Sequence, residues 1–158
     1  VSDYILYGKY QDQVKAQENL TYMQPFYDLL KKHQGKMIYI DFWGPWCPPC
    51  LAEMEPLKEL RKKYSTDDIV FISICRNDDR KQYKQVLDKY GMHVDGIEHI
   101  HADDLQAESQ VHKMYNQLNI DGIPYFFIIN REGVIVNYGS MMRPSYPGTA
   151  EYIEEWLE

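Results

Sequence analysis

Two cysteines lie close together in the stretch Trp46-Cys47-Pro48-Pro49-Cys50. At the start of a helix, free backbone N–H groups and the helix dipole favour negative charge, which stabilises a thiolate over a thiol. Because the thiolate is the form that attacks disulfides, Cys47 is the candidate nucleophile. Cys50 follows one helical turn later, close enough to resolve the mixed disulfide that forms. The spacing therefore predicts dithiol–disulfide exchange.

Three structural interpretations compete with this chemistry. A disulfide across so short a loop would contribute only about 2 kcal/mol to stability, so a purely structural staple would achieve little. A zinc site needs two further ligands, yet the sequence has no second C-x-x-C, and His99 and His101 belong to a separate predicted strand. Two unrelated core cysteines would not need the flanking Trp46 or the prolines. The third cysteine, Cys75, lies in an apolar run and is expected to pack as a small hydrophobic residue.

The residues before the pair predict a buried strand. Residues 37–43 form a short apolar run with one acid, Asp41, which is typical of a central strand covered on both faces. Both prolines are tolerated in the first turn of a helix, so one helix is expected from Cys47 to about Tyr64. The cysteines would then lie at the carboxyl end of a strand, where open α/β sheets place their binding sites.

Along the rest of the chain, the spacing of apolar residues alternates between the pattern typical of helices and the pattern typical of strands. Helices are expected near residues 22–33, 83–90, 111–118 and 150–157, and strands over 69–75, 97–101, 125–129 and 134–138, the last two joined by a turn at 130–133. This order predicts one α/β domain over residues 1–158. His99 and His101 alternate on one face of their strand, and a solvated edge is the expected position.

Composition excludes several classes of protein. With 158 residues, 44% of them apolar, the chain can bury a full core, which argues against disorder. Its net charge is −7, from 17 Lys and Arg against 24 Asp and Glu, so it offers little to nucleic acid. The longest uncharged stretch, 42–52, falls short of the roughly 18 apolar residues of a membrane span. Because Val1 is followed by no basic or apolar leader, the chain is interpreted as a mature or trimmed product.

Two separated motifs resemble those of the thioredoxin superfamily. The stretch Asp41 to Cys50 is similar to the superfamily's active-site segment, and Gly122-Ile123-Pro124 is similar to its second hallmark, a loop that carries a cis-proline. Within the superfamily, the segment 73–118, the turn at 130–133 and Arg143-Pro144-Ser145 resemble the TlpA/ResA-like thiol-disulfide oxidoreductases.

The resemblance covers about residues 20–158. It implies a thioredoxin fold, with a central mixed β-sheet flanked by helices. It also implies a TlpA-type central insertion over about 76–118, preceded by an N-terminal extension at 1–20. The activity implied is that of an exported protein-disulfide reductase of bacterial envelopes, periplasmic or otherwise extracytoplasmic, and a cytoplasmic location stays open.

Carried over residue by residue, the resemblance places the nucleophile on Cys47, the resolving thiol on Cys50 and the cis-proline on Pro124. Asp41 falls where thioredoxins have a buried acid. Burial should raise its pKa toward the working pH and let it take the proton from Cys50, unless the residue is a solvated strand end. Glu53 falls where the TlpA/ResA-like proteins have a glutamate, and it is either a redox residue or an acid favoured by the helix dipole.

The expected substrate-binding residues are Trp46, Ile123, Pro124 and Tyr125. Because a proline has no N–H, the Ile123 backbone beside it can be left free to pair with an extended substrate segment. Trp46 would supply an exposed apolar wall, unless it packs against the sheet edge. Tyr125 replaces the small residue usual after the cis-proline, and its phenol could narrow or gate the substrate groove.

The motif also departs from the common pattern. Pro48 and Pro49 remove two N–H groups near Cys47, so we expect a Cys47 pKa above that of a Pro48→Gly variant and a more reducing couple. Pro56 is six residues after Cys50, one later than usual in the family, so the helix kink is expected to shift.

These features favour a monomeric reductase that needs no cofactor and no metal. Its partners would be a disulfide-containing protein substrate and an upstream thiol electron donor. The alternatives are a disulfide isomerase or oxidase, and a redox-silent peptide-binding adaptor on the same fold.

Overall fold

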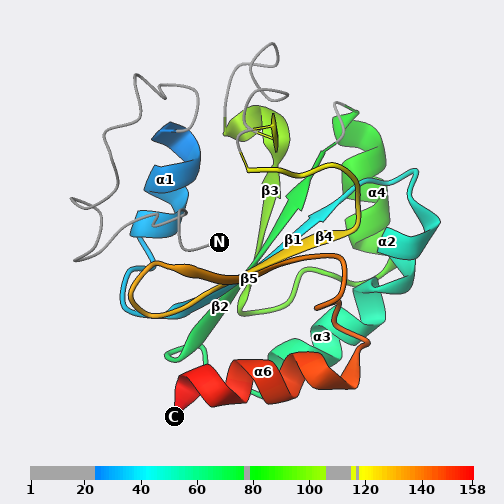
Figure 1. The fold of residues 1–158 in the computed structure, drawn as a ribbon. Helices are drawn as coiled ribbons and strands as arrows, with labels where there is room; N and C mark the ends of the chain where they lie inside the picture. The colour runs from blue at the N-terminus through cyan, green and yellow to red at the C-terminus, as the bar shows by residue number, and fades with distance from the viewer. Residues whose placement is uncertain (1–23, 77–78, 106–114, 117) are drawn as a thin grey trace.

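The strand that leads to the cysteines, β1 (Met37–Trp43), is the middle strand of a five-stranded sheet in the computed structural model (Figure 1). It pairs in parallel with β2 (Ile69–Cys75) and antiparallel with β4 (Tyr125–Ile129). β3 (Ile97–His101) and β5 (Ile135–Gly139) complete the order β3-β2-β1-β4-β5. The sheet is therefore mixed, as predicted, and every residue of β1 is buried, which explains its nearly continuous apolar sequence.

The structure describes residues 24–76, 79–105, 115–116 and 118–158. The predicted N-terminal extension over 1–20 lies outside the described residues, as does most of the predicted helix near 111–118. Two of the described residues in the range predicted for that helix, Tyr115 and Leu118, are buried. None of the described helices is both long enough and apolar enough to span a bilayer.

Side chains alternate between the two faces of the sheet and form two buried clusters. On one face, helix α1 (Gln24–Lys31) packs over a cluster that includes Phe42 and Phe127, whose rings meet edge to face at 5.5 Å. On the other face, Tyr39, Trp43 and the two cysteines lie in the second cluster. The helices α2 (Pro48–Ala52), α3 (Met54–Lys62), α4 (Arg80–Lys89) and α6 (Pro147–Leu157) cover this second face (Figure 1).

The prediction of one continuous helix after Cys47 was wrong, because the helix is interrupted at Glu53 between α2 and α3. Pro56 provides the physical reason: it has no N–H to donate to the carbonyl of Ala52, and its ring would clash there. Instead, the Glu53 N–H donates to the Cys50 carbonyl at 3.1 Å, and the Leu57 N–H donates to the Glu53 carbonyl at 2.9 Å. The break places the Glu53 side chain at the junction of the two helices.

Candidate active site

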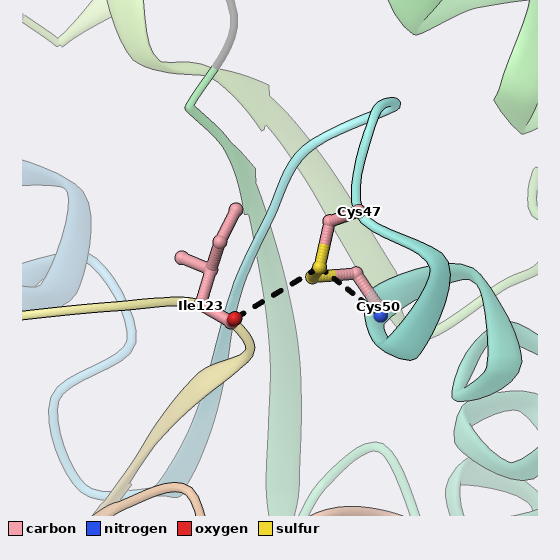
Figure 2. Close-up of a disulfide and its surroundings, with 3 residues drawn as sticks. All are labelled: Cys47, Cys50 and Ile123. Carbon is pink, nitrogen blue, oxygen red and sulfur yellow. Dashed lines mark hydrogen bonds between the residues drawn. A yellow bond between two sulfur atoms is a disulfide. The ribbon is translucent and has the colours of Figure 1, made fainter.

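Cys47 and Cys50 form a disulfide at the carboxyl end of β1 (Figure 2). Cys47 is the N-cap of α2, with an extended backbone, and Cys50 lies in the first turn of that helix. Their Cα atoms are 5.2 Å apart, and the two residues are only 7% and 3% exposed. The outer sulfur, that of Cys47, is therefore the one a substrate reaches more easily.

Two backbone groups lie next to the Sγ atom of Cys47, and dashed lines join them in Figure 2. The Cys50 N–H donates to this sulfur at 3.3 Å, and the Ile123 carbonyl oxygen lies 3.9 Å away. Because a disulfide sulfur carries no hydrogen, the second contact is a close approach that only a reduced Cys47 thiol can turn into a hydrogen bond. The sulfur is thus placed between the helix and the proline loop.

The prolines limit how many donors the Cys47 sulfur meets. Pro48 and Pro49 occupy the first two positions of α2, and neither has an N–H. An N-cap side chain accepts from the second or third N–H of its helix, and here only the third, that of Cys50, exists. The structure therefore gives the Cys47 sulfur one helical donor.

Asp41 is buried on the face of β1 that carries the cysteines, and 7% of it is exposed. Burial raises its pKa to about 7, a hydrogen bond from the Ser73 hydroxyl lowers it, and the negative charge of Glu53 raises it. The Ser73 Oγ donates to Asp41 Oδ2 at 3.1 Å. The predicted rise in pKa is confirmed, and the alternative of a solvated strand end is wrong. The proton-accepting role of Asp41 stays a prediction.

Glu53 connects the helix break to the segment that precedes α6. Its Oε1 accepts a hydrogen bond from the Ser145 backbone N–H at 2.8 Å. The Tyr39 hydroxyl makes a second connection by donating to the Met142 carbonyl at 2.6 Å. Burial, followed by the charges of Asp41 and Glu53, raises the Tyr39 pKa. Glu53 thus acts both on the electrostatics of Asp41 and on the position of a loop.

Sequence reasoning missed Ser73, Tyr39 and the segment around Met142. A usable signal existed for Ser73, because it is the one hydroxyl in an apolar strand and pairs in register with Asp41. No comparable signal existed for Tyr39 and Met142, whose contact joins residues that are far apart in the chain.

The expected substrate-binding residues occupy different environments. Trp46 is 56% exposed beside Cys47, which excludes the alternative of simple packing. The Ile123–Pro124 peptide bond is cis, the isomer that the resemblance implies, and both residues are half-buried. Tyr125 is 6% exposed and belongs to the cluster on the opposite face, edge to face with Phe127 at 5.5 Å. Its gating role stays a prediction.

The histidines of β3 do not lie on a solvated edge. His101 is completely buried, with the Tyr83 ring of α4 edge on at 5.3 Å, so the expectation of a solvated position was wrong for this residue. His99 is half-buried, and its Nε2 lies 2.7 Å from the Met92 carbonyl oxygen. Helix α4 covers this end of the sheet. Within the described ranges, no three His, Cys, Asp or Glu side chains are grouped so that they could hold a metal ion.

Comparison with known proteins gives a consistent set of similarities. A family model described as thioredoxin-like matches residues 35–135. The thiol-disulfide oxidoreductase ResA of Halalkalibacterium halodurans is 27% identical over 134 residues, which cover 82% of this chain and 65% of the relative. ResA of Bacillus anthracis is 26% identical over 107 residues, which cover 68% of this chain and 56% of the relative. The chain thus spans less than two thirds of the length of these relatives.

Solved structures agree with the sequence matches. A Bacteroides vulgatus protein described as a thiol-disulfide oxidoreductase has a crystal structure that superposes with a TM-score of 0.65 at 31% identity, over 80% of this chain and 82% of the other. A solution structure with the same description and organism gives a TM-score of 0.63 at 37% identity, over 81% and 78% of the two chains.

The raised pKa of Asp41 predicts a pH dependence of stability. An acid whose folded pKa is raised favours folding when protonated, so its contribution is lost as pH rises from about 4 to about 7. Relative to Asp41→Asn, the oxidised wild type should lose about 4 kcal/mol of unfolding free energy over this range. Urea unfolding of both proteins at a series of pH values measures the difference. An Asp67→Asn control, at an exposed acid, should follow the wild type. Parallel profiles for wild type and Asp41→Asn would contradict the assignment.

The helix start predicts which proline matters for the Cys47 thiol. Pro49→Ala restores the second N–H of α2, which can reach an N-cap side chain, whereas Pro48→Ala restores the first. The Cys47 pKa should therefore fall in both variants and fall further in Pro49→Ala, with a less reducing couple. The pH dependence of iodoacetamide labelling of the reduced proteins measures this order. The expectation fails if the labelling rate of Pro49→Ala depends on pH in the same way as that of the wild type.

Proposed function

The chain belongs to the thioredoxin-like family as a TlpA/ResA-like member, and we propose that it is a thiol-disulfide oxidoreductase that reduces disulfides in protein substrates. The observation that carries the proposal is the position of the Cys47–Cys50 disulfide, at a helix N-terminus and 3.9 Å from the carbonyl of the proline loop. A purely structural cross-link would not need to lie beside an exposed Trp46.

In the first step, the thiolate of reduced Cys47 attacks one sulfur of the substrate disulfide. An S–S bond forms between Cys47 and the substrate, the substrate's own S–S bond breaks, and its second sulfur leaves as a thiolate that takes up a proton. The Cys50 N–H stabilises the attacking thiolate, because it already points at the Cys47 sulfur.

In the second step, Cys50 resolves the mixed disulfide. Asp41, with a pKa of about 7, takes the proton of the Cys50 thiol directly or through one water. The Cys50 thiolate then attacks the Cys47 sulfur, the Cys47–Cys50 bond forms as the bond between Cys47 and the substrate breaks, and the substrate sulfur leaves as a thiolate that takes up a proton. Two electrons have passed from the dithiol to the substrate, and a separate thiol electron donor must return them.

Substrate would bind at the surface formed by Trp46, Ile123 and Pro124, with Tyr125 behind the proline loop. The half-buried Ile123 lies next to the Cys47 sulfur, so an extended substrate segment can pair with its backbone as it delivers a disulfide. Glu53 would hold the neighbouring segment through Ser145 and keep Asp41 protonated to a higher pH.

The direction of electron flow and the location of the protein are part of the proposal. Reduction is favoured over oxidation because the two prolines leave the Cys47 thiolate with a single helical donor. The resemblance to the TlpA/ResA-like proteins supports a monomer in an extracytoplasmic compartment. An isomerase or oxidase, and a redox-silent adaptor, are the alternatives that experiment must exclude.

Reduction of insulin disulfides tests the activity. The wild-type protein with dithiothreitol should precipitate insulin chains, and Cys47→Ser should show only the background rate, because the attacking sulfur is gone. Reduced Cys50→Ser, freed of dithiothreitol before it is mixed with insulin, should accumulate a mixed disulfide that non-reducing electrophoresis detects. A wild type without activity would favour the adaptor. Rescue of scrambled ribonuclease, or a high reduction potential, would favour the isomerase or oxidase.

The pH profile of resolution tests the role of Asp41. When reduced protein reacts with an aromatic disulfide reagent, release of the second aromatic thiol reports attack by Cys50. This rate should rise through pH 7 in the wild type, and Asp41→Asn should lose the inflection and slow by about 10²-fold. Ser73→Ala should move the inflection to higher pH, because it removes the hydrogen bond that lowers the Asp41 pKa. An unchanged profile in Asp41→Asn would exclude the role.

A further inference from the structure

A hollow of about 470 Å³ opens beside the proline loop, on the side toward the end of β5. Ile123 and Pro124 line it on one side, and Tyr138, Gly139 and Ser140 line it on the other. Because the Ile123 carbonyl lies 3.9 Å from the Cys47 sulfur, the hollow begins one residue away from the reacting atom. A substrate segment that pairs with the Ile123 backbone therefore lies next to this hollow.

The hollow carries a negative charge. Asp121 is exposed and lines it, and the lining residues that the structure describes include no Lys, Arg or His. Among the described residues, no ion pair uses the Asp121 carboxylate. A cation that entered the hollow would meet this carboxylate with no competing positive charge.

An aromatic ring lines the same hollow. Tyr138 lies near the end of the edge strand β5 and is 43% exposed. Exposed aromatic rings attract Lys and Arg side chains through the ring quadrupole and also pack against their alkyl stems. A carboxylate together with an exposed ring is a combination suited to a basic side chain and poorly suited to an acidic one.

We propose that this hollow binds a lysine or arginine side chain that flanks the disulfide cysteine of the protein substrate. The inference rests on the proposed oxidoreductase function and names the class of its substrate. In an extended segment, side chains two residues apart point the same way and are separated by about 7 Å. A basic residue two positions from the substrate cysteine can therefore point toward the hollow while the cysteine points toward Cys47. The net charge of −7 adds long-range attraction for basic partners.

Matched peptides test the proposal. Three disulfide-linked peptides that differ only in Arg, Leu or Glu two residues before the cysteine are reduced by the wild-type protein at low salt, and rate constants are compared. Arg should exceed Glu by about fivefold, and the ratio should shrink at high salt. Asp121→Asn and Tyr138→Ala should each lower the preference, and Asp121→Lys should reverse it toward Glu. Asp67→Asn removes the same charge at the opposite end of the sheet and should keep the preference.

A binding measurement separates this proposal from the proposed function. The same three peptides with Ser in place of Cys cannot react, and their affinities for the oxidised protein should follow the same order. Equal affinities, or tightest binding of the Leu peptide, would overturn the basic-side-chain inference even if every disulfide peptide is reduced. Conversely, if the protein binds the Arg peptide most tightly but reduces none of the disulfide peptides, the basic-side-chain inference would stand and the proposed oxidoreductase function would be overturned.

Discussion

The Cys47 sulfur caps a helix that begins with two prolines, and most features of the site depend on this arrangement. The buried strand β1 ends just before α2 starts, so the sulfur is held at the carboxyl end of the middle strand. The prolines fix the first helical turn and at the same time remove its first two donors. The remaining donor, the Cys50 N–H, comes from the residue that also supplies the second sulfur. The geometry that stabilises the thiolate is therefore the geometry that brings its partner within reach.

A buried carboxyl group in β1, that of Asp41, opposes stability when it is ionised. Desolvation is the largest influence on Asp41, and the Ser73 hydroxyl offsets only part of it, while Glu53 adds to it. A neutral residue would suit the same strand better, because each neighbouring position of β1 is apolar and buried. A pKa near neutrality is instead the property expected of a group that accepts and returns a proton during turnover.

The sequence allowed the sheet to be predicted more fully than the site. Strands β1, β2 and β4 are nearly continuous apolar runs, and their bounds follow directly from that pattern. A kink was expected from Pro56, but a break into two helices at Glu53 was not, because the helical spacing of apolar residues continues through it. The burial of His101 depends on the packing of Tyr83 from α4, and no local pattern encodes such a contact. The Cys47–Cys50 pair was identifiable because its chemistry lies within a single turn.

The segment between β5 and α6 contacts both the residues around Asp41 and the hollow beside the proline loop. It begins at Ser140, which lines the hollow together with Gly139 of β5, and it continues to Met142 and Ser145. Met142 accepts the hydrogen bond of Tyr39, and Ser145 donates to Glu53, whose charge acts on Asp41. A substrate side chain in the proposed hollow would contact the start of this segment, and Glu53 is bound near its far end. Occupation of the hollow and the proton affinity of Asp41 thus share one structural element, and coupling between them would act through the Glu53 carboxylate.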